Sequence, residues 1–187
     1  VTITVDDVDE APVFSSGATA SVAENQTAAY TAAAADDEGT VLTYSLSGTD
    51  AALFSIDAGT GVVTFNAAPD YESPGDAGGD NVYDIVVSAS DGVNTTDQAV
   101  AITVTDENDN SPVFTSASSF TVAENETSAF TAVATDADAG GTITYSLSGA
   151  DAAAFKIDAT TGVVTFVTAP DYETPGDQSF DLVVTAS

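Results

Sequence analysis

Apolar and polar residues alternate along much of this chain. In NVYDIVVSAS (residues 81–90), every second residue from Tyr83 to Ala89 is apolar or aromatic, while the opposite face carries polar residues such as Asp84. QSFDLVVTAS (178–187) repeats the same alternation. A period of two residues is typical of β-strands that bury one face in a core. The sequence therefore predicts a half-buried strand at both places.

Shorter stretches that contain β-branched and aromatic residues predict the remaining strands, and turn-forming residues separate them. We expect these strands at 27–35, 41–47, 52–57, 61–65 and 98–104. A helix is the alternative for TAAYTAAAADD (27–37), because alanine is the best helix former. Its counterpart TSAFTAVATD (127–136) is richer in β-branched and aromatic residues, which favours strands over a helix.

The chain contains a long internal repeat. SVAENQTAAYTA (21–32) returns as TVAENETSAFTA (121–132), and residues 42–76 return as residues 143–177 with most positions unchanged. Corresponding positions lie about 100 residues apart, which is the size of a domain rather than of a solenoid repeat. Each unit must therefore bury its own core. With about seven short strands per unit, the sequence predicts an all-β protein of two tandem Greek-key sandwiches of immunoglobulin-like shape.

A net charge of −29 excludes several classes of partner. Lys156 is the single basic residue against 30 acidic ones, so salt bridges within the chain cannot neutralise the carboxylates. This negative field repels nucleic acids and anionic membrane surfaces, and we expect neither as a partner. Because 43% of the residues are hydrophobic, a folded core is favoured over disorder. No apolar run approaches the roughly 18–20 residues of a membrane span, so membrane insertion is not expected.

Five short motifs together resemble those of cadherin repeats. TDENDNSPVF (105–114) is similar to the linker between two such repeats, and the resemblance extends to AEN (23–25), PDYE (69–72), ASDG (89–92) and DAD (136–138). The motifs follow the order of the family and cover essentially the whole chain. The composition is rich in alanine and threonine and nearly free of lysine. It resembles the tandem repeats of large bacterial surface proteins more than those of animal adhesion receptors.

The resemblance implies that the acidic motifs bind calcium as a cofactor. Calcium takes about six to eight oxygen ligands from carboxylates, amides, backbone carbonyls and water. The absence of histidine and cysteine leaves few ligands for zinc or copper. Two unneutralised carboxylates about 4 Å apart repel each other by roughly 4 kcal/mol at an effective dielectric constant near 20. We therefore expect the linker to loosen when calcium is removed.

By similarity to cadherins, one junction combines ligands from both repeats and the linker. The first repeat and the linker would contribute Glu24, Asp70, Glu72, Asp109 and the backbone carbonyl of Glu107. The set would be completed by Asn108, the carbonyl of Asn110, Asp136 and Asp138, with Asp138 bridging ions. Tyr71 stands where the family usually has arginine. This departure leaves the ligands intact and implies different packing beneath them.

The first residues of the chain resemble a second linker. Aligning VTITV (1–5) with VAITV (100–104) preserves the apolar face of the strand, which a one-residue slip would invert. In this register, Asp7, Asp9, Glu10 and Ala11 correspond to Asp106, Asn108, Asp109 and Asn110. The resemblance adds to the expected calcium ligands a second set, namely Asp9, Glu10, Asp36, Glu38 and Asp91.

These motifs predict the domain boundaries. Residues 1–11 would end a preceding domain and its linker, 12–105 would form the first cadherin-like domain, 106–111 the calcium-binding linker, and 112–187 the second domain. The second repeat stops at VVTAS (183–187), whereas the first continues into the closing strand at 98–104. We therefore expect the second sandwich to lack its last strand and to be less stable than the first.

The sequence gives little support to catalysis. Without histidine and cysteine, the common nucleophilic triads are excluded. Instead it predicts a calcium-rigidified spacer or adhesion segment, located outside the cell or at its surface, within a larger multi-repeat protein. Its partners would be calcium ions, neighbouring repeats of the same chain, and another cell-surface protein or a polysaccharide. The alternative is a carbohydrate- or cell-binding module that uses the sheet faces, although the chain has no tryptophan for an exposed aromatic platform.

Overall fold

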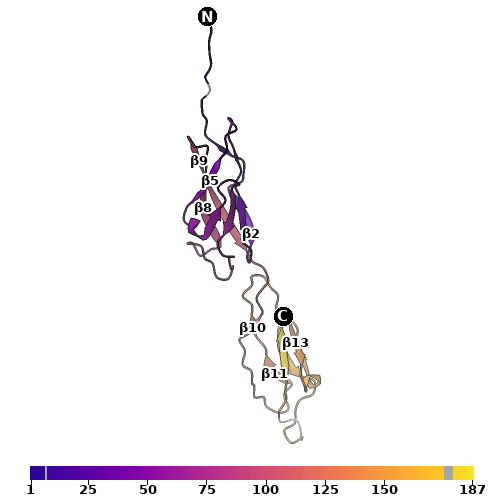
Figure 1. The fold of residues 1–187 in the computed structure, drawn as a ribbon. Helices are drawn as coiled ribbons and strands as arrows, with labels where there is room; N and C mark the ends of the chain where they lie inside the picture. Colours follow the sequence, from indigo (N-terminus) through magenta and orange to yellow (C-terminus); the bar gives the residue numbers. More distant parts are fainter. Residues whose placement is uncertain (7, 175–178) are drawn as a thin grey trace. The chain divides into compact units, whose positions relative to one another are not determined.

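The computed structural model describes residues 1–6, 8–174 and 179–187. These form two compact units, Val1–Glu107 and Asn108–Ser187, each built of strands with one short 3₁₀ helix (Figure 1). The description leaves out Asp7 and residues 175–178. Part of the predicted first linker and the first residue of the predicted strand at 178–187 therefore lie outside the described residues. Within the described ranges, no helix has the length and apolar character that crossing a membrane requires.

The strands of the first unit form a sandwich. They are β1 (Val13–Phe14), β2 (Thr19–Ala23), β3 (Ala28–Thr31), β4 (Ala34–Ala35), β5 (Thr43–Ser47), β6 (Phe54–Ile56), β7 (Val62–Phe65), β8 (Val82–Ser90) and β9 (Thr95–Thr105), with η1 (Ala51–Leu53) before β6. One sheet has the order β2-β9-β8-β5 and the other β3-β7-β6, while β1 pairs with β4. All pairs are antiparallel except β2 with β9, which run parallel.

A single hydrophobic core fills the space between the two sheets of the first unit. It joins residues of β8 and β9 to Phe54 and Phe65 from the opposite sheet. The ring of Tyr83 meets these two phenylalanines edge-on, with centroid distances of 5.8 and 5.1 Å. The inward face predicted for residues 81–90 is confirmed, because Tyr83, Ile85, Val87 and Ala89 are all buried. Edge-on aromatic packing and β-branched side chains together hold the sheets in register.

The helical alternative for residues 27–37 is wrong, since β3 and β4 occupy this stretch. Pairing with β7 and β1 outweighs the helix propensity of alanine here. The predicted strand at 52–57 begins later than expected, because η1 takes its first residues and the backbone N–H of Leu53 donates to the carbonyl of Asp50 at 2.9 Å. The strand β2 was not predicted, because its small residues show little alternation.

The second unit repeats this plan with fewer strands. It contains β10 (Val113–Phe114), β11 (Ser128–Thr131), β12 (Ala134–Thr135), β13 (Tyr145–Ser148), η2 (Ala152–Ala154), β14 (Phe155–Ile157), β15 (Val163–Phe166) and β16 (Val183–Ala186). The sheets have the orders β11-β15-β14, β13-β16 and β10-β12. Phe155, Phe166 and Phe180 reproduce the aromatic group of the first unit.

The sheet that has four strands in the first unit has two in the described part of the second. Residues 119–123, the counterparts of β2, form no strand, and no strand of the described residues takes the position of β9 beside β16. The buried residues of this unit accordingly form two separate clusters rather than one core. The prediction of two tandem sandwiches, the second without its last strand, agrees with this architecture.

Candidate metal centres

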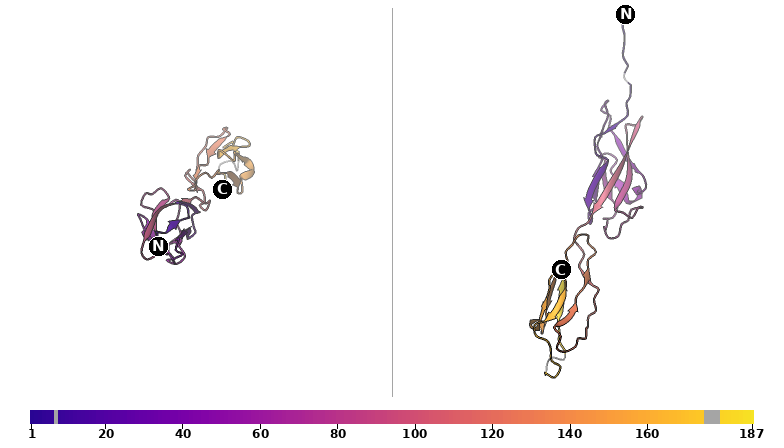
Figure 2. Two further views of the ribbon diagram at one scale, coloured as in Figure 1. Left: turned by 90° about the horizontal axis from the view of Figure 1, so that it is seen from above. Right: turned by 180° about the vertical axis from the view of Figure 1, so that it is seen from behind.

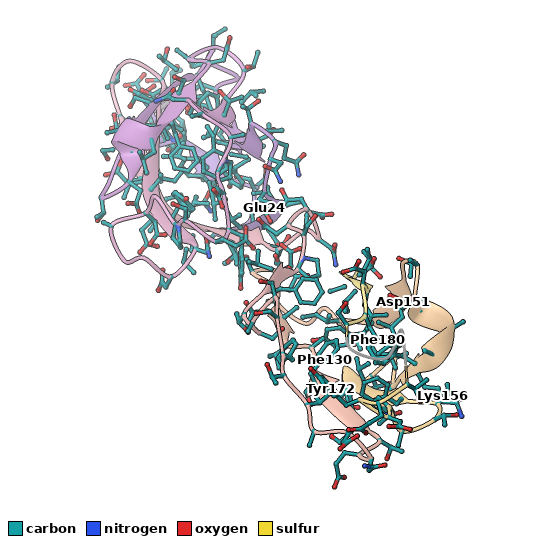
Figure 3. All side chains as sticks on the ribbon, turned by 90° about the horizontal axis from the view of Figure 1, so that it is seen from below. Glu24, Phe130, Asp151, Lys156, Tyr172 and Phe180 are labelled. Carbon is teal, nitrogen blue, oxygen red and sulfur yellow. The ribbon has the colours of Figure 1, made fainter. Side chains whose placement is uncertain are left out.

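Three carboxylates converge where β2 and β9 of the first unit end. Glu24, Glu72 and Asp106, here called the Glu24 cluster, each place one oxygen within 4.8 Å of the others. Glu24 directly follows β2, is only 3% exposed, and is labelled in Figure 3. Its two oxygens accept hydrogen bonds from the backbone N–H groups of Tyr71, at 2.7 Å, and of Glu107, at 2.9 Å. These bonds hold a buried negative charge in a fixed orientation.

The Glu24 cluster is electrostatically strained. Burial raises the pKa of the Glu72 carboxyl above its ordinary value, and the neighbouring acids Asp106 and Glu24 raise it further. The Oε1 atom of Glu72 is buried and accepts no hydrogen bond from the described residues. A buried carboxylate oxygen without a donor, beside two further carboxylates, fits a cation with oxygen ligands.

The loop that carries Glu72 is fixed by local hydrogen bonds. The Oδ1 atom of Asp70 accepts from the backbone N–H groups of Glu72, at 3.1 Å, and Ser73, at 3.2 Å. The amide of Asn81 donates to the carbonyl of Tyr71 at 2.9 Å, and the Tyr71 side chain packs against the core. The Oδ1 atom of Asp70 thus shapes the loop, and Asp106 is a member of the Glu24 cluster that the sequence did not predict.

Acidic and amide side chains also gather at the start of the second unit, in the Asp138 cluster. Its members are Asp109, Asn110, Asp136 and Asp138. The side chain of Asp138 is buried and accepts from both the backbone N–H of Asn110, at 3.0 Å, and its side-chain amide, at 2.8 Å. The same amide donates to Asp109 at 2.9 Å, and Asp136 accepts from the Asp138 backbone at 3.3 Å. Asn108 is exposed at the beginning of the unit.

The N-terminal end of the first unit holds the Asp9 cluster. It consists of Asp9, Glu10, Asp36, Glu38 and Asp91. Asn94 links the linker to the domain, because its amide donates to the Asp9 carboxylate at 2.8 Å and to the Asp9 carbonyl at 3.1 Å. The acids that were predicted as a second set of ligands lie far apart in the sequence. In the structure they lie close together.

Burial and repulsion between like charges both act on the Asp9 cluster. Burial, followed by the charges of Asp91, Asp36 and Glu10, raises the pKa of Asp9. A side-chain hydrogen bond with Glu10 raises the pKa of Glu38 to about 7. One oxygen each of Asp36 and Asp91 is buried without a hydrogen-bond partner in the described structure. The side chains of this cluster offer carboxylate oxygens as metal ligands and no nitrogen or sulfur. Such a set suits a hard cation.

A further cluster was missed by reasoning from the sequence. Glu124, Asp171 and Glu173 of the second unit lie with one oxygen each within 4.8 Å of one another. The backbone N–H of Tyr172 donates to Glu124 at 3.0 Å, as that of Tyr71 does to Glu24. The repeat itself was the available signal, because these acids correspond to Glu24, Asp70 and Glu72.

The second tyrosine of these loops differs from the first. Tyr172 is 63% exposed, whereas Tyr71 packs partly buried against the core of its unit. Figure 3 shows Tyr172 together with Phe130 and Phe180 in the second unit, and Lys156 projecting at its periphery. Among the described residues, Lys156 forms no ion pair with a carboxylate of the second unit's Glu124, Asp171 and Glu173 group.

The sequence of this chain is similar to those of several known proteins. No family model matches the chain. The chain is 38% identical over 150 residues to protocadherin Fat 4 of Mus musculus, and 36% identical over 161 residues to cadherin EGF LAG seven-pass G-type receptor 1 of Mus musculus. The alignments cover 75% and 80% of this chain, but it spans only 3% and 5% of the lengths of those relatives.

Solved structures share the fold. A crystal structure of human protocadherin-24 EC1-2 superposes with a TM-score of 0.73 at 23% identity, covering 96% of this chain and 94% of that one. Mouse cadherin-23 EC22-24 gives a TM-score of 0.73 at 26% identity, with 95% and 65% covered. Drosophila N-cadherin EC1-4 gives 0.73 at 25% identity, with 95% and 45% covered. The predicted all-β tandem architecture is confirmed.

Proposed function

We propose, from the premise that both units are cadherin-like repeats, that this chain is a calcium-stiffened segment of a longer surface protein, in which it acts as a spacer or in adhesion. The premise rests on the sequence relatives and the shared fold. The relatives are adhesion proteins and not enzymes, and the chain is accordingly placed outside the cell or at its surface. We include in this proposal an adhesion partner, either a cell-surface protein or a polysaccharide. The residues described above do not identify which.

The observation that carries the calcium proposal is the pattern of buried carboxylate oxygens without donors. Such atoms occur in Glu72, Asp36 and Asp91, and each lies among further acids. Burying an unpaired charged oxygen costs free energy unless a cation or a donor compensates it. In a chain with one basic residue, a metal ion is the available compensation. The residues that would hold it are those of the Glu24, Asp9 and Asp138 clusters.

Calcium at the junction would also limit movement between the repeats. Asp106 of the Glu24 cluster and Asp109 of the Asp138 cluster are separated by two residues in the sequence. An ion bound on each side of this short stretch would neutralise charges that otherwise repel one another. A stiff linker would keep the angle between successive repeats constant. The spacer role follows from this proposal, because a series of repeats at fixed angles keeps an extended form.

Calcium titration of the chain by calorimetry tests the proposal. We expect binding in the native chain and at least a roughly 10-fold weaker affinity, about 1.4 kcal/mol, at one class of sites in each of Glu72→Gln, Asp91→Asn and Asp138→Asn. Asp84→Asn removes the same charge from an exposed position on β8 outside the clusters and should leave binding unchanged. Absence of calcium binding, or equal affinities in all four variants, would refute the assignment.

Small-angle scattering tests the stiffening separately. We expect the distribution of molecular size, measured as the radius of gyration, to be narrower with calcium than with chelator. We also expect calcium to raise the melting temperature, because a ligand that binds the folded state stabilises it. Identical profiles with and without calcium would reject the spacer role even if the ion binds.

The alternative of a carbohydrate-binding module is not favoured. Tyr44 and Tyr83 are buried in the first core and offer no platform for a sugar ring. The bacterial surface context remains a prediction from composition, and the sequence relatives named above come from animals.

A further inference from the structure

Asn81 has a left-handed backbone conformation directly before β8. Its φ is 63°, in a region that glycine adopts freely and that few residues with a side chain occupy. Its side chain is 8% exposed, and its Oδ1 atom is buried without a hydrogen-bond partner in the described structure. Glycine would relieve both costs at this position. Backbone strain combined with an unpaired buried oxygen therefore points to a role for the rest of the asparagine side chain.

The side-chain amide of Asn81 supports the loop that carries Glu72. Its Nδ2 atom donates to the backbone carbonyl of Tyr71 at 2.9 Å. That carbonyl belongs to the same planar peptide unit as the backbone N–H of Glu72, which donates to Oδ1 of Asp70 at 3.1 Å. Both polar groups of the peptide unit before Glu72 are therefore held, and its rotation is restricted.

The backbone of Asn81 connects the same loop to β9. Its carbonyl accepts from the N–H of Val104 at 2.9 Å, and its own N–H donates to Oδ1 of Asp76 at 3.1 Å. Val104 lies in β9, two residues before Asp106 in the sequence. Figure 2 shows β2 and β9 side by side in the first unit, in agreement with their parallel pairing. Asn81 therefore contacts two of the three segments that supply the Glu24 cluster.

The third segment is reached through Tyr71. The backbone N–H of Tyr71 donates to Oε2 of Glu24 at 2.7 Å, while its carbonyl accepts from Asn81. The Oε1 atom of Glu72, in contrast, accepts no hydrogen bond from the described residues. The direction of the Glu72 side chain therefore depends on the backbone that carries it, and Asn81 holds that backbone.

We propose that Asn81 is a positioning residue of the Glu24 cluster, which fixes the Glu72 loop relative to Asp106 so that the carboxylates are already in place for a divalent cation. The inference rests on the proposed calcium function and adds to that site an uncharged residue that acts through the backbone. Like charges in the cluster repel one another, so the loop would move outward without the amide of Asn81. Removing a group that orients a metal ligand typically weakens metal affinity roughly 10- to 100-fold.

Calcium titration of Asn81→Gly tests the proposal. Glycine adopts the same φ and keeps the backbone hydrogen bonds, so this variant removes the side-chain amide alone. We expect the affinity of the class of sites that depends on Glu72 to fall about 10-fold and that of the other classes to stay unchanged.

Two control variants separate positioning from stability. Asn66→Gly makes the same substitution outside the clusters, where Nδ2 of Asn66 donates to the carbonyl of Ala52 at 3.0 Å. Val63→Ala leaves a cavity in the core on β7 and should lower the melting temperature. We expect native calcium affinity in both. Native affinity in Asn81→Gly, or an equal loss in Val63→Ala, would overturn the proposal.

A double-variant cycle with Glu72→Ala shows whether Asn81 acts through Glu72. Once the Glu72 side chain is absent, adding Asn81→Gly should weaken the remaining affinity by less than about 2-fold, because the two substitutions remove the same contribution. Residues that act independently would instead show the full loss of about 10-fold in both backgrounds, and that result would reject the positioning role.

Amide hydrogen exchange in chelator tests the same contact without calcium. In Asn81→Gly, we expect exchange at Tyr71 and Glu72 to accelerate at least about 10-fold more than at Ile85 and Val87 of β8, which report on unfolding of the whole unit. A native chain that binds no calcium would refute the proposed function and the cation role of Asn81 with it. Normal calcium binding in the native chain, with unchanged exchange at Tyr71 and Glu72 in the variant, would refute the inference alone.

Discussion

Glu38 and Glu10 share a hydrogen bond between two acidic side chains. Such a bond requires a proton on one of them, and it is the main cause that raises the pKa of Glu38 from 4.5 to about 7. Asp57 and Asp158 show the opposite case, because hydrogen bonds from nearby threonine and glycine groups lower their pKa below 3.8. The pKa of a carboxyl group in this chain thus moves up or down according to whether its hydrogen-bond partner is another acid or an N–H or O–H donor.

We expect the calcium-free chain to lose stability as the pH rises from about 4.5 to about 7. Glu38 binds its proton more tightly in the folded state than in the unfolded state, so its contribution is complete below 4.5 and is lost as the pH passes its folded pKa of about 7. Melting temperatures measured in chelator across this range provide the test. Glu38→Gln keeps a hydrogen-bonding side chain without the titration and should flatten the dependence, whereas an equally steep profile in that variant would contradict the assignment.

Asp50 and Asp151 precede the two 3₁₀ helices, and both accept backbone hydrogen bonds from neighbouring segments. Asp50 is buried, and its two oxygens accept from the backbone N–H groups of Ala77, at 2.8 Å, and Asp84, at 2.7 Å. Asp151, labelled in Figure 3, accepts from the backbone N–H of Asp181 at 2.7 Å and is more exposed. Asp50 therefore ties the loop before β8, and β8 itself, to η1.

Asp50→Ala should destabilise the first unit by roughly 2–4 kcal/mol, because two N–H groups near the core lose a charged acceptor. Asp151→Ala should cost the second unit roughly 1 kcal/mol, since water can replace the lost acceptor at a more exposed site. Scanning calorimetry of both variants in calcium-saturated buffer measures these changes. Equal losses would show that burial of the acceptor does not control the anchoring of these loops.

At the scale of the whole molecule, two units of similar sequence have different cores. The first unit has one continuous cluster of buried residues, and the described residues of the second have two smaller ones. The difference follows from the number of strands in one sheet. The sheet that contains β8 has four strands, whereas the corresponding sheet in the described part of the second unit, which contains β16, has two. Hydrophobic burial scales with the apolar area removed from water, so the second unit gains less from folding.

Amide hydrogen exchange should reveal this difference. We expect β13 and β16 to exchange faster than β5 and β8, because fewer strands surround them in their sheet. Equal protection of the two sheets would contradict the link between strand number and stability.

Much of the local structure was determined by the sequence alone. The alternation in 81–90 specified which face of β8 is buried, because side chains in a strand point to opposite sides at every residue. The repeat specified two units, because positions about 100 residues apart must belong to separately packed cores. The acidic motifs correctly indicated that Asp9, Asp36, Glu38 and Asp91 come together, while their role as calcium ligands stays a prediction.

Only the tertiary structure decided the rest. Leu182 and Val184 are as apolar as Ile85 and Val87, yet they are less buried because, in the described structure, β16 has β13 on one edge and no strand on the other. Residues 119–123 form no strand for the same reason, since a strand exists only when a neighbour receives its hydrogen bonds. Asp106 joins the Glu24 cluster because β9 and β2 end side by side, which the sequence pattern did not indicate. Pattern and composition describe what each residue prefers, whereas burial and pairing depend on which other segment occupies the adjacent space.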